Sequence, residues 1–384
     1  MKRNIALFTG KLAGGGAERM ASRLSFALSE HYNVFILIYN SQRSDYYASG
    51  KIIDLGNGAS RTSLRFLHSI IQINRVIKEN NIELVISFLE LPNLINSFFN
   101  YSCKKAVSIR SWIDSGEKNL KNYLAGAGAR KADGIIAMTF RQKQFLMHEM
   151  NVPEEKIWIL ENLYDCAQIK NAAYKKIADQ KIRDFVNSET AIAVGRLVKK
   201  KNYFRLLKIF SYVHQKDEKA KLLILGEGKL LEKLKTLSKS YGIEDRVMFA
   251  SRAEDPFPII ANSAFYISVS ENEGFPNALM EAMICGIPVM HTDCLCGPFE
   301  ILSCKQIHEE CHHISFEDYG ILLPIEKEGK EEEIADLWIR MLKDENLRSH
   351  YAKMSQIRAE MNDTSLIKEK YIQMIEFLTG ASKC

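Results

Sequence analysis

Short apolar segments alternate with amphipathic helical patterns along almost the whole chain, and this alternation limits the fold more than any other feature. In the first half, the expected strands are residues 4–9, 34–39, 84–88, 106–109, 134–138 and 157–160. In the second half, they are residues 191–194, 221–225, 247–249, 265–269 and 288–290. Helical spacing of apolar residues fills most intervals between them. Such alternation predicts α/β domains, each with a parallel sheet covered by helices on both faces.

The alternation pauses once, at residues 166–188, which are polar and lack a strong period. A chain of 384 residues fits two domains. We therefore expect an N-terminal domain, a linker, a C-terminal domain and a last helix that packs back on the first domain, at residues 1–167, 168–188, 189–362 and 363–384. Right-handed crossovers make both domains doubly wound, and such sheets bind ligands beyond the carboxyl ends of their strands.

The net charge of +5 is unevenly distributed. Residues 1–180 carry 24 Lys and Arg against 16 Asp and Glu, so the first half is basic. A basic half favours an anionic partner, either a phosphorylated substrate, an anionic membrane surface or nucleic acid, although solvated lysines without a target are equally compatible. The basic residues are not interleaved with aromatics as single-strand binding favours, so we expect no nucleic acid partner.

Eight cysteines are present, five of them between Cys285 and Cys311, but no C-x-x-C pair occurs. Paired spacing is typical of zinc sites, so we expect free thiols and no metal. The apolar run at the start is too short for a signal peptide, and no run is long enough to span a membrane. These features predict a cytoplasmic protein, attached at most to the inner face of the cytoplasmic membrane.

The first motif, Gly14-Gly15-Gly16-Ala17-Glu18-Arg19, lies between the first strand and the first helix. Glycines there let a ligand approach the backbone, and a helix N-terminus favours anions. A dinucleotide site would need a third glycine where Arg19 stands and an acidic residue at the end of the second strand. That strand ends in Tyr39-Asn40, so NAD and FAD are disfavoured. A tight turn without a ligand remains the alternative.

The second motif, Gly195-Arg196-Leu-Val-Lys-Lys-Lys201-Asn202, follows the first strand of the second half and leads into a helix. Arg196 and Lys201 stand five residues apart across a loop, so both can turn toward one anion. Arginine grips phosphate bidentately and lysine acts as a compact charge, which favours a diphosphate. A solvated Lys-rich turn is the alternative.

The third motif is Glu273-Gly274-Phe275-Pro276-Asn277-Ala278-Leu279-Met280-Glu281. Proline is favoured in a first helical turn, so a helix should begin near Pro276 and point free N–H groups at the preceding loop. One glutamate can hold a hexose and the other a ribose, while phosphates between them meet the helix N-terminus. Two surface glutamates on a solvated helix are the alternative.

The third motif resembles the E-x7-E motif of retaining glycosyltransferases of family 4, which have the GT-B fold of two doubly wound Rossmann-like domains facing across a cleft. Arg196 and Lys201 match that family's phosphate-binding stretch and its spacing. Further similar segments are Gly14–Arg19, Leu225-Gly226-Glu227-Gly228, Asp245-Arg246-Val247-Met248-Phe249, Glu161-Asn162-Leu-Tyr-Asp165 and Asp293-Cys-Leu-Cys-Gly297-Pro298-Phe-Glu300. The resemblance covers nearly the whole chain.

The resemblance implies a role for each matched residue. Arg196 and Lys201 would neutralise the donor diphosphate, Glu281 would bind the ribose, and Glu273 would hold the transferred sugar together with the backbone of Gly274, Phe275, Pro276, Asn277 and Ala278. Gly15, Gly16 and Gly226 would pack against the donor, and the strand containing Val247 would meet the base. Where many members carry an active-site histidine, this chain has Arg110, which would contact phosphate or sugar.

The expected activity is metal-independent transfer, with retention, of a hexose or N-acetylhexosamine from a nucleotide-diphosphate sugar, UDP-sugar being the first choice. No D-x-D pair is present to bridge a metal. The expected acceptor is a saccharide linked to polyprenyl diphosphate, in O-antigen or capsule biosynthesis, with peripheral attachment to a membrane. Alternatives are a nucleotide-sugar epimerase or another GT-B enzyme, and a non-catalytic binder of nucleotide sugars or nucleic acid. None of the nine histidines stands out as catalytic.

Overall fold

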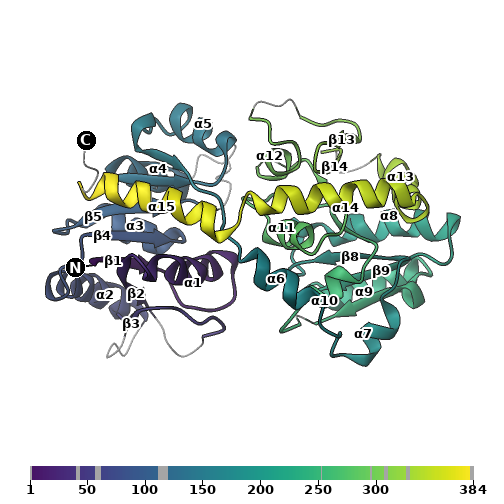
Figure 1. The fold of residues 1–384 in the computed structure, drawn as a ribbon, viewed down its shortest axis with the longest axis horizontal. Helices are drawn as coiled ribbons and strands as arrows, with labels where there is room; N and C mark the ends of the chain where they lie inside the picture. Colours follow the sequence, from purple (N-terminus) through teal and green to yellow (C-terminus); the bar gives the residue numbers. More distant parts are fainter. Residues whose placement is uncertain are drawn as a thin grey trace. The chain divides into compact units, whose positions relative to one another are not determined.

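The computed structural model describes residues 2–39, 44–56, 62–110, 120–251, 253–294, 296–306, 310–325 and 329–380. The chain divides into two compact units. Unit 1 comprises Met1–Tyr164 and Asn362–Cys384, and unit 2 comprises Asp165–Met361. Figure 1 shows a layer of strands between helices in each unit, and each unit is described by itself.

Unit 1 contains a seven-stranded sheet in the order β3-β2-β1-β4-β5-β6-β7, with every described pair parallel. Its strands are β1 (Arg3–Phe8), β2 (Tyr32–Ile38), β3 (Lys51–Asp54), β4 (Leu84–Phe88), β5 (Lys104–Ser108), β6 (Gly134–Ala137) and β7 (Ile157–Ile159). Its helices are α1 (Gly16–Ser29), α2 (Thr62–Glu79), α3 (Glu90–Phe98), α4 (Leu120–Lys131), α5 (Phe140–His148), the 3-10 turn η1 (Glu154–Lys156) and α15 (Thr364–Leu378).

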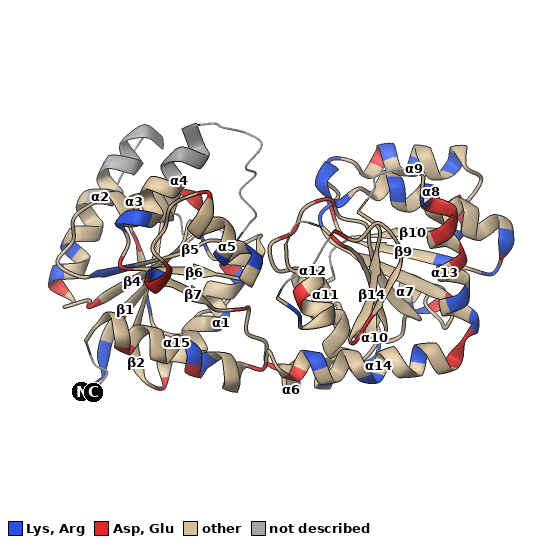
Figure 2. Ribbon diagram, turned by 90° about the horizontal axis from the view of Figure 1, so that it is seen from above, with Lys and Arg blue, Asp and Glu red and all other residues tan. Residues whose placement is uncertain are grey.

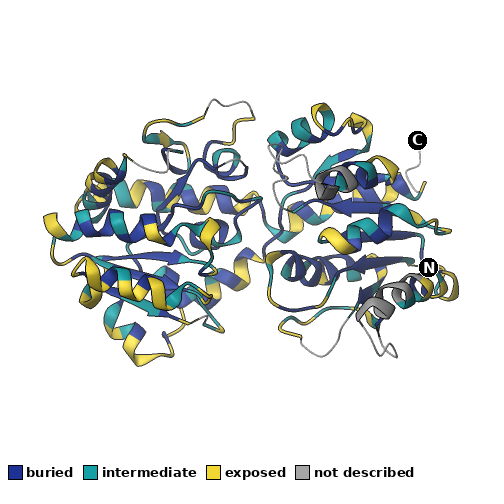
Figure 3. Ribbon diagram, turned by 180° about the vertical axis from the view of Figure 1, so that it is seen from behind, coloured by how far each residue is buried: buried dark blue, intermediate teal, exposed yellow. Residues whose placement is uncertain are grey.

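The core of unit 1 follows the apolar periodicity of the sequence. Strands β1 and β4 are buried on both faces, which explains their unbroken apolar runs. Most strand residues between the helices are dark blue in Figure 3. Helix α1 buries the five residues expected from helical spacing, namely Ala17, Met20, Ala21, Leu24 and Leu28. The last helix, α15, joins the same core through Tyr371 and Ile375.

Unit 2 contains a seven-stranded sheet in the order β10-β9-β8-β11-β12-β14-β13, parallel except for the β13–β14 pair. Its strands are β8 (Thr190–Val194), β9 (Lys221–Leu225), β10 (Val247–Ala250), β11 (Phe265–Ser268), β12 (Val289–Thr292), β13 (Ser315–Glu317) and β14 (Gly320–Leu323). Its helices are α6 (Cys166–Ala173), α7 (Gln180–Phe185), α8 (Tyr203–Lys216), α9 (Leu231–Ser240), α10 (Phe257–Ala261), α11 (Asn277–Ile284), α12 (Pro298–Ser303), α13 (Glu331–Lys343), α14 (Glu345–Glu360) and the 3-10 turns η2 (Lys199–Lys201) and η3 (Glu244–Arg246).

Residues 166–188, which we expected to be mainly a linker, contain two capped helices that cluster with unit 2. Asp165 accepts a hydrogen bond from the backbone N–H of Gln168 and so begins α6. Asp179 begins α7 in the same way, by accepting from the N–H of Ile182. Both helices are too short to show a clear period, but an acidic cap before each is a recognisable signal.

The order of strands places a switch point in the middle of the unit 2 sheet. The chain runs from β8 to β9 and β10 on one side and then returns to β11 and β12 on the other. Ala191 of β8 pairs with Phe265 of β11, so these two strands are neighbours. The loops that follow them therefore leave adjacent strands in opposite directions along the sheet. Ligands bind at such points in doubly wound sheets. The loops at residues 195–202 and 269–276 lie there, and they carry the second and third motifs.

Candidate functional site

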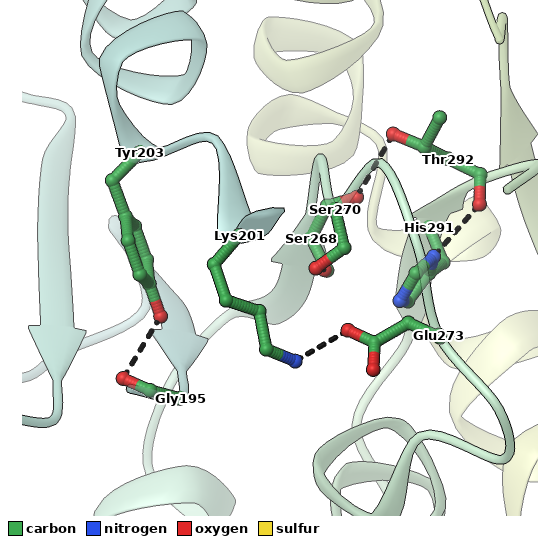
Figure 4. A network of polar contacts seen from close by, with 8 residues as sticks. All are labelled: Gly195, Lys201, Tyr203, Ser268, Ser270, Glu273, His291 and Thr292. Carbon is green, nitrogen blue, oxygen red and sulfur yellow. Dashed lines mark hydrogen bonds and ion pairs between the residues drawn. The ribbon is translucent and has the colours of Figure 1, made fainter. Parts of the chain in front are cut away.

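The side chains of Lys201 and Glu273 meet at the switch point of unit 2. The Nζ of Lys201 donates a hydrogen bond to Oε1 of Glu273, and only 16% and 10% of the two side chains are exposed (Figure 4). Lys201 ends the turn η2, after which Asn202 adopts a left-handed conformation and caps α8 through the N–H of Arg205. The turn thus directs the lysine toward the loop after β11, as the sequence predicted.

A row of hydroxyl groups stands behind Glu273 on β11 and the loop that follows. Ser270 makes a side-chain hydrogen bond to Glu273, and its hydroxyl lies 3.1 Å from that of Ser268. The phenol of Tyr266 bonds Ser268 in turn. These residues are two apart in sequence, so a strand directs them to one face. The row holds Glu273 from the side of the sheet.

The charge of Glu273 is set by two opposing effects. Burial alone would raise the pKa of Glu273, but the nearby Lys201 and the hydrogen bonds from Lys201 and Ser270 lower the pKa below its ordinary value. Glu273 is therefore an anion at neutral pH. An ionised carboxylate accepts hydrogen bonds only, so its oxygens suit donors such as sugar hydroxyls.

Two further cations belong to this site. Loss of hydration lowers the pKa of Lys200. The negative charge of Glu273 opposes this shift, and the positive charges of Lys201 and Arg196 add to it. Lys200 therefore interacts with all three groups. Arg196 lies on the loop after β8, where the sequence placed it, and it is exposed. The sequence did not single out Lys200. Three cations around one carboxylate leave a positive excess that can attract a diphosphate.

A small pocket opens beside the Lys201–Glu273 pair. Its walls come from the ends of β8 and β11 and the start of α8, with Lys201, Tyr203, Ser268 and Ser270 as its polar members. The phenol of Tyr203 donates to the carbonyl of Gly195 at 3.1 Å, which holds the loop after β8 against α8. The pocket therefore lies where both predicted motifs converge.

Two glycines allow the loops of the site to approach one another. A Cβ at Gly226 would stand 1.9 Å from the carbonyl oxygen of Gly195, so the loop after β9 requires glycine there. Gly297 has φ of +88°, and a Cβ there would stand 2.3 Å from the carbonyl oxygen of Gly274. Gly226 thus positions the Arg196 loop by backbone packing, and Gly297 does the same for the Glu273 loop.

The helix α11 begins where the third motif predicted, with Pro276 as its N-cap. Gly274, Phe275, Pro276, Asn277 and Ala278 therefore follow Glu273 directly, at the N-terminal end of this helix. Glu281 lies inside the helix and is 3% exposed. Its carboxylate influences the pKa of Cys285, one turn further along. The structure thus separates the two glutamates by one turn of buried helix.

The contact of Val247 with a nucleotide base stays a prediction, and the structure places this residue at the amino end of its strand. Val247 is the first residue of β10, pairs with Leu222 and packs into the core. The carboxyl end of this strand is Ala250, whose carbonyl accepts from the N–H of Gly226 at 2.9 Å. The motif identified the strand β10 but did not show which of its two ends lies near the site. Ala250 is at the end near the site, so residues around Ala250 are the ones placed for backbone contact with a base.

His291 was missed by the sequence reasoning, and it lies beside Glu273. This histidine is fully buried near the end of β12, and its Nδ1 lies 2.8 Å from the carbonyl oxygen of Thr292. Burial lowers the pKa of His291 to about 4, against the opposing influence of Glu273. A histidine on an apolar strand carries no recognisable pattern, so only the structure reveals its neighbour.

In unit 1, the predicted glycine loop stands at the carboxyl end of β1. Gly15 is the N-cap of α1, and a Cβ there would stand 2.3 Å from the carboxylate of Glu18. The N–H of Gly14 donates to Asp45 at 3.1 Å. The helix N-terminus that includes Gly16 therefore already faces carboxylates of the protein. Because these carboxylates repel a phosphate, the loop is a less favourable phosphate site than the sequence suggested. Carboxylates accept hydrogen bonds from hydroxyl groups, so hydroxyl groups suit this loop better.

Arg110 is bound within unit 1. Its guanidinium donates to Ser108 at 2.8 Å, to Asn162 and to the phenol of Tyr371 at 2.9 Å. The group also lies over the ring of Phe88, 5.2 Å from its centroid. These contacts join β5, the residues after β7 and α15, so Arg110 has a structural role in addition to any contact with substrate.

Within the described part of the chain, no His, Cys, Asp or Glu side chains form a group of three that could hold a metal ion. Seven cysteines are free thiols. Among the described helices, none combines the length and the apolar character needed to cross a membrane. Figure 2 shows Lys and Arg interspersed with Asp and Glu on helices of both units, so the predicted anionic partner stays a prediction.

The model of one protein family, described as glycosyl transferases group 1, matches residues 175–358. That match covers the Lys201–Glu273 site and both of its motifs. Residues 175–358 belong to the group 1 glycosyltransferases.

Two relatives match this chain along most of its length. An uncharacterized glycosyltransferase of Methanocaldococcus jannaschii is 27% identical, over 88% of this chain and 92% of its own length. The second is the N-acetylgalactosamine-N,N'-diacetylbacillosaminyl-diphospho-undecaprenol 4-alpha-N-acetylgalactosaminyltransferase of Campylobacter jejuni. It is 25% identical, over 94% of this chain and 95% of its own length.

Solved structures establish the GT-B fold for this chain. HepE of Anabaena in complex with UDP and glucose has a TM-score of 0.78 at 15% identity, covering 98% of this chain and 100% of its own. WaaG, a glycosyltransferase involved in lipopolysaccharide biosynthesis, has a TM-score of 0.71 at 16% identity, covering 98% of this chain and 100% of its own. At these identities the likeness shows the fold alone, and it confirms the predicted pair of doubly wound domains.

Proposed function

We propose that this glycosyltransferase moves a hexose or N-acetylhexosamine from a nucleoside diphosphate sugar to a lipid-linked saccharide, with retention of configuration and without a metal. The Lys201–Glu273 pair carries the proposal, because it sets a cation and a hydroxyl acceptor side by side at the switch point. UDP is the first choice of nucleotide, since HepE of Anabaena was solved with UDP and UDP-glucose.

We assign protein contacts to each part of the donor, beginning with the transferred sugar and ending with the ribose. Glu273 accepts hydroxyls of the transferred sugar, and Arg196 and Lys201 bind the diphosphate. A lysine ammonium has three donors, and Glu273 uses one, so Lys201 can also contact a phosphate oxygen. The N–H groups at the start of α11 face the same anion. Glu281 remains the proposed ribose ligand, because it lies on the same helix and is buried.

The chemistry is then mainly electrostatic. Negative charge grows on the departing diphosphate as the bond to the sugar breaks, and fixed cations stabilise that charge most when water is excluded. Lys201 is mostly buried, which satisfies this condition. Three basic side chains around the site supply the positive charge that a divalent metal provides in other transferases. This supply, together with the lack of a D-x-D pair, supports metal independence.

The acceptor is proposed from the relatives and from unit 1. The Campylobacter jejuni relative is named for a diphospho-undecaprenol substrate, and Erwinia amylovora has a relative named for amylovoran biosynthesis. These names support a role in surface polysaccharides, either O-antigen or capsule. Glu18 and Asp45 beside Gly15 suit neutral hydroxyls of a saccharide. Attachment to the inner face of a membrane would bring the enzyme to a lipid-linked acceptor.

A panel of UDP-, GDP-, ADP- and TDP-sugars tests the donor by thermal shift in EDTA. A binder stabilises the fold in proportion to RT ln(1 + [L]/Kd), so the matching nucleotide sugar should raise the melting temperature. Proton NMR of the glycosylated product then reads the anomeric configuration. Inversion, or a need for added metal, would contradict the proposal, and conversion of donor without acceptor would indicate an epimerase. No shift with any nucleotide sugar would reject the donor class.

A further inference from the structure

The tautomer of His291 can be read from one contact. The Thr292 carbonyl lies 2.8 Å from Nδ1, and a carbonyl oxygen can only accept a hydrogen bond. Nδ1 must therefore carry the proton. In a neutral ring the other nitrogen, Nε2, then has a free lone pair. The ring is buried, and the strand β12 holds it in place.

The unprotonated Nε2 has a defined neighbourhood. Nε2 is fully buried and has no hydrogen-bond partner among the described residues. Figure 4 shows this nitrogen on the side of the ring away from Thr292 and toward Ser268 and Glu273. The lone pair is thus directed at the residue proposed to hold the sugar.

We infer that His291 is a positioning residue for Glu273: its ring limits by packing where the carboxylate can lie, and it donates no hydrogen bond to that carboxylate. Lys201 and Ser270 bind the carboxylate from other sides. A ring nitrogen with a proton would compete with the sugar for the carboxylate, whereas a bare nitrogen does not. The remaining acceptor capacity of Glu273 is kept for hydroxyls of the transferred sugar. This inference rests on the proposed function, because it assigns the sugar to Glu273.

The consequence is specific to the sugar and does not extend to the nucleotide. Glu273 contacts the sugar in the proposed site, while Glu281 and the cations contact ribose and diphosphate. Loss of His291 should therefore reduce the extra affinity that the sugar adds to UDP. Affinity for UDP itself should not change. A purely structural histidine would lower both affinities together, through a loss of folded protein.

Three variants separate these cases by titration calorimetry with UDP and with the UDP-sugar that the donor panel selects. H291N keeps a donor for the Thr292 carbonyl but removes the part that faces Glu273. We expect its affinity for the UDP-sugar to fall about tenfold, with unchanged affinity for UDP. H291Q reaches the position of Nε2 but brings an amide N–H that can bind Glu273, so it should keep the reduced affinity for the UDP-sugar. H214N, in the last turn of α8, is the matched control and should bind as the wild type does.

The tautomer is measured separately, by nitrogen-15 NMR of histidine-labelled wild-type protein. The His291 signals, assigned by their loss in H291Q or H291N, should show a proton on Nδ1 and none on Nε2 at neutral pH. A proton on Nε2 would overturn the inference, even if a variant does not fold. UDP-sugar affinity unchanged in H291N would overturn it as well, with the proposed function intact. Wild-type protein that binds neither UDP nor any UDP-sugar contradicts the proposed function, and the inference falls with it.

Discussion

The ammonium group of Lys201 binds the carboxylate of Glu273 across 72 residues of sequence, from opposite sides of the switch point in unit 2. The pair links two loops that follow adjacent strands, β8 and β11. The position of Lys201 therefore depends on the position of Glu273. The one contact between Lys201 and Glu273 therefore holds both the proposed phosphate ligand and the proposed sugar ligand in place.

A double-mutant cycle tests this coupling. K201M leaves the buried carboxylate of Glu273 without its ion-pair partner, which should lower the free energy of unfolding by about 3 kcal/mol. The double variant K201M/E273Q should recover most of the loss, because no unpaired charge remains. Urea unfolding measures K201M, E273Q and the double variant K201M/E273Q. K199M, at an exposed lysine of the same turn, is the control and should shift stability by less than about 0.5 kcal/mol. Additive losses in the double variant would show that the pair is not coupled.

The close approach of two loops gives a second prediction. In G226A, the new Cβ would stand 1.9 Å from the carbonyl oxygen of Gly195, so the loop that carries Arg196 must move. Unfolding free energy should fall by about 3 kcal/mol, and nucleotide affinity should fall with it. G126A is the control, since its Cβ would meet no atom closer than 3.6 Å in helix α4. Stability of G226A equal to that of G126A would contradict this packing.

The buried histidine predicts a pH dependence of stability. Burial lowers the pKa of His291 from an ordinary 6.5 to about 4 in the folded protein. Between these values the unfolded chain takes up a proton that the folded chain does not, so stability falls as the pH falls from about 6.5 to about 4. The loss from this group approaches about 3 kcal/mol at the acid end. Unfolding measured in this window should show a shallower slope for H291Q than for wild type, and parallel curves would contradict the assignment.

Arg110 offers a choice between two roles. R110M removes the contacts to Asn162 and Tyr371, so unit 1 should lose about 2 kcal/mol of stability. Hydrogen exchange should rise in α15, while affinity for UDP at unit 2 stays the same. Loss of sugar transfer with unchanged stability and exchange would instead show that Arg110 acts on the substrate, as the sequence suggested.

The parts of the fold that were predicted share a physical cause. Buried parallel strands such as β4 (Leu84–Phe88) and β9 (Lys221–Leu225) need apolar residues throughout, so their bounds follow directly from the sequence. The strands that were missed, β3, β13 and β14, are only three or four residues long. The strands β3 and β13 lie at the edges of their sheets, where exposed and half-exposed residues break the apolar pattern. The strand β14 is fully buried, so its short apolar run was recognisable and was passed over.

The sequence pointed to two charged residues of the candidate site but not to the residues around them. Lys201 and Glu273 each stood in a loop after an expected strand, and the switch point brings such loops together. His291 and Lys200 carried no spacing that a motif could reveal. For Val247, the motif named the strand β10 without saying which of its two ends lies near the loops of the site. Contacts between strands that are distant in sequence decide these details.

Calorimetric titration of the selected UDP-sugar in EDTA tests the central assignment most directly, with wild type, K201M and K199M compared in one series. We expect wild type and K199M to bind the UDP-sugar tightly without metal. The affinity of K201M should be about a hundredfold lower, because K201M loses a mostly buried charged contact. Equal affinity in K201M and K199M would contradict the assignment of the Lys201–Glu273 pair to the donor.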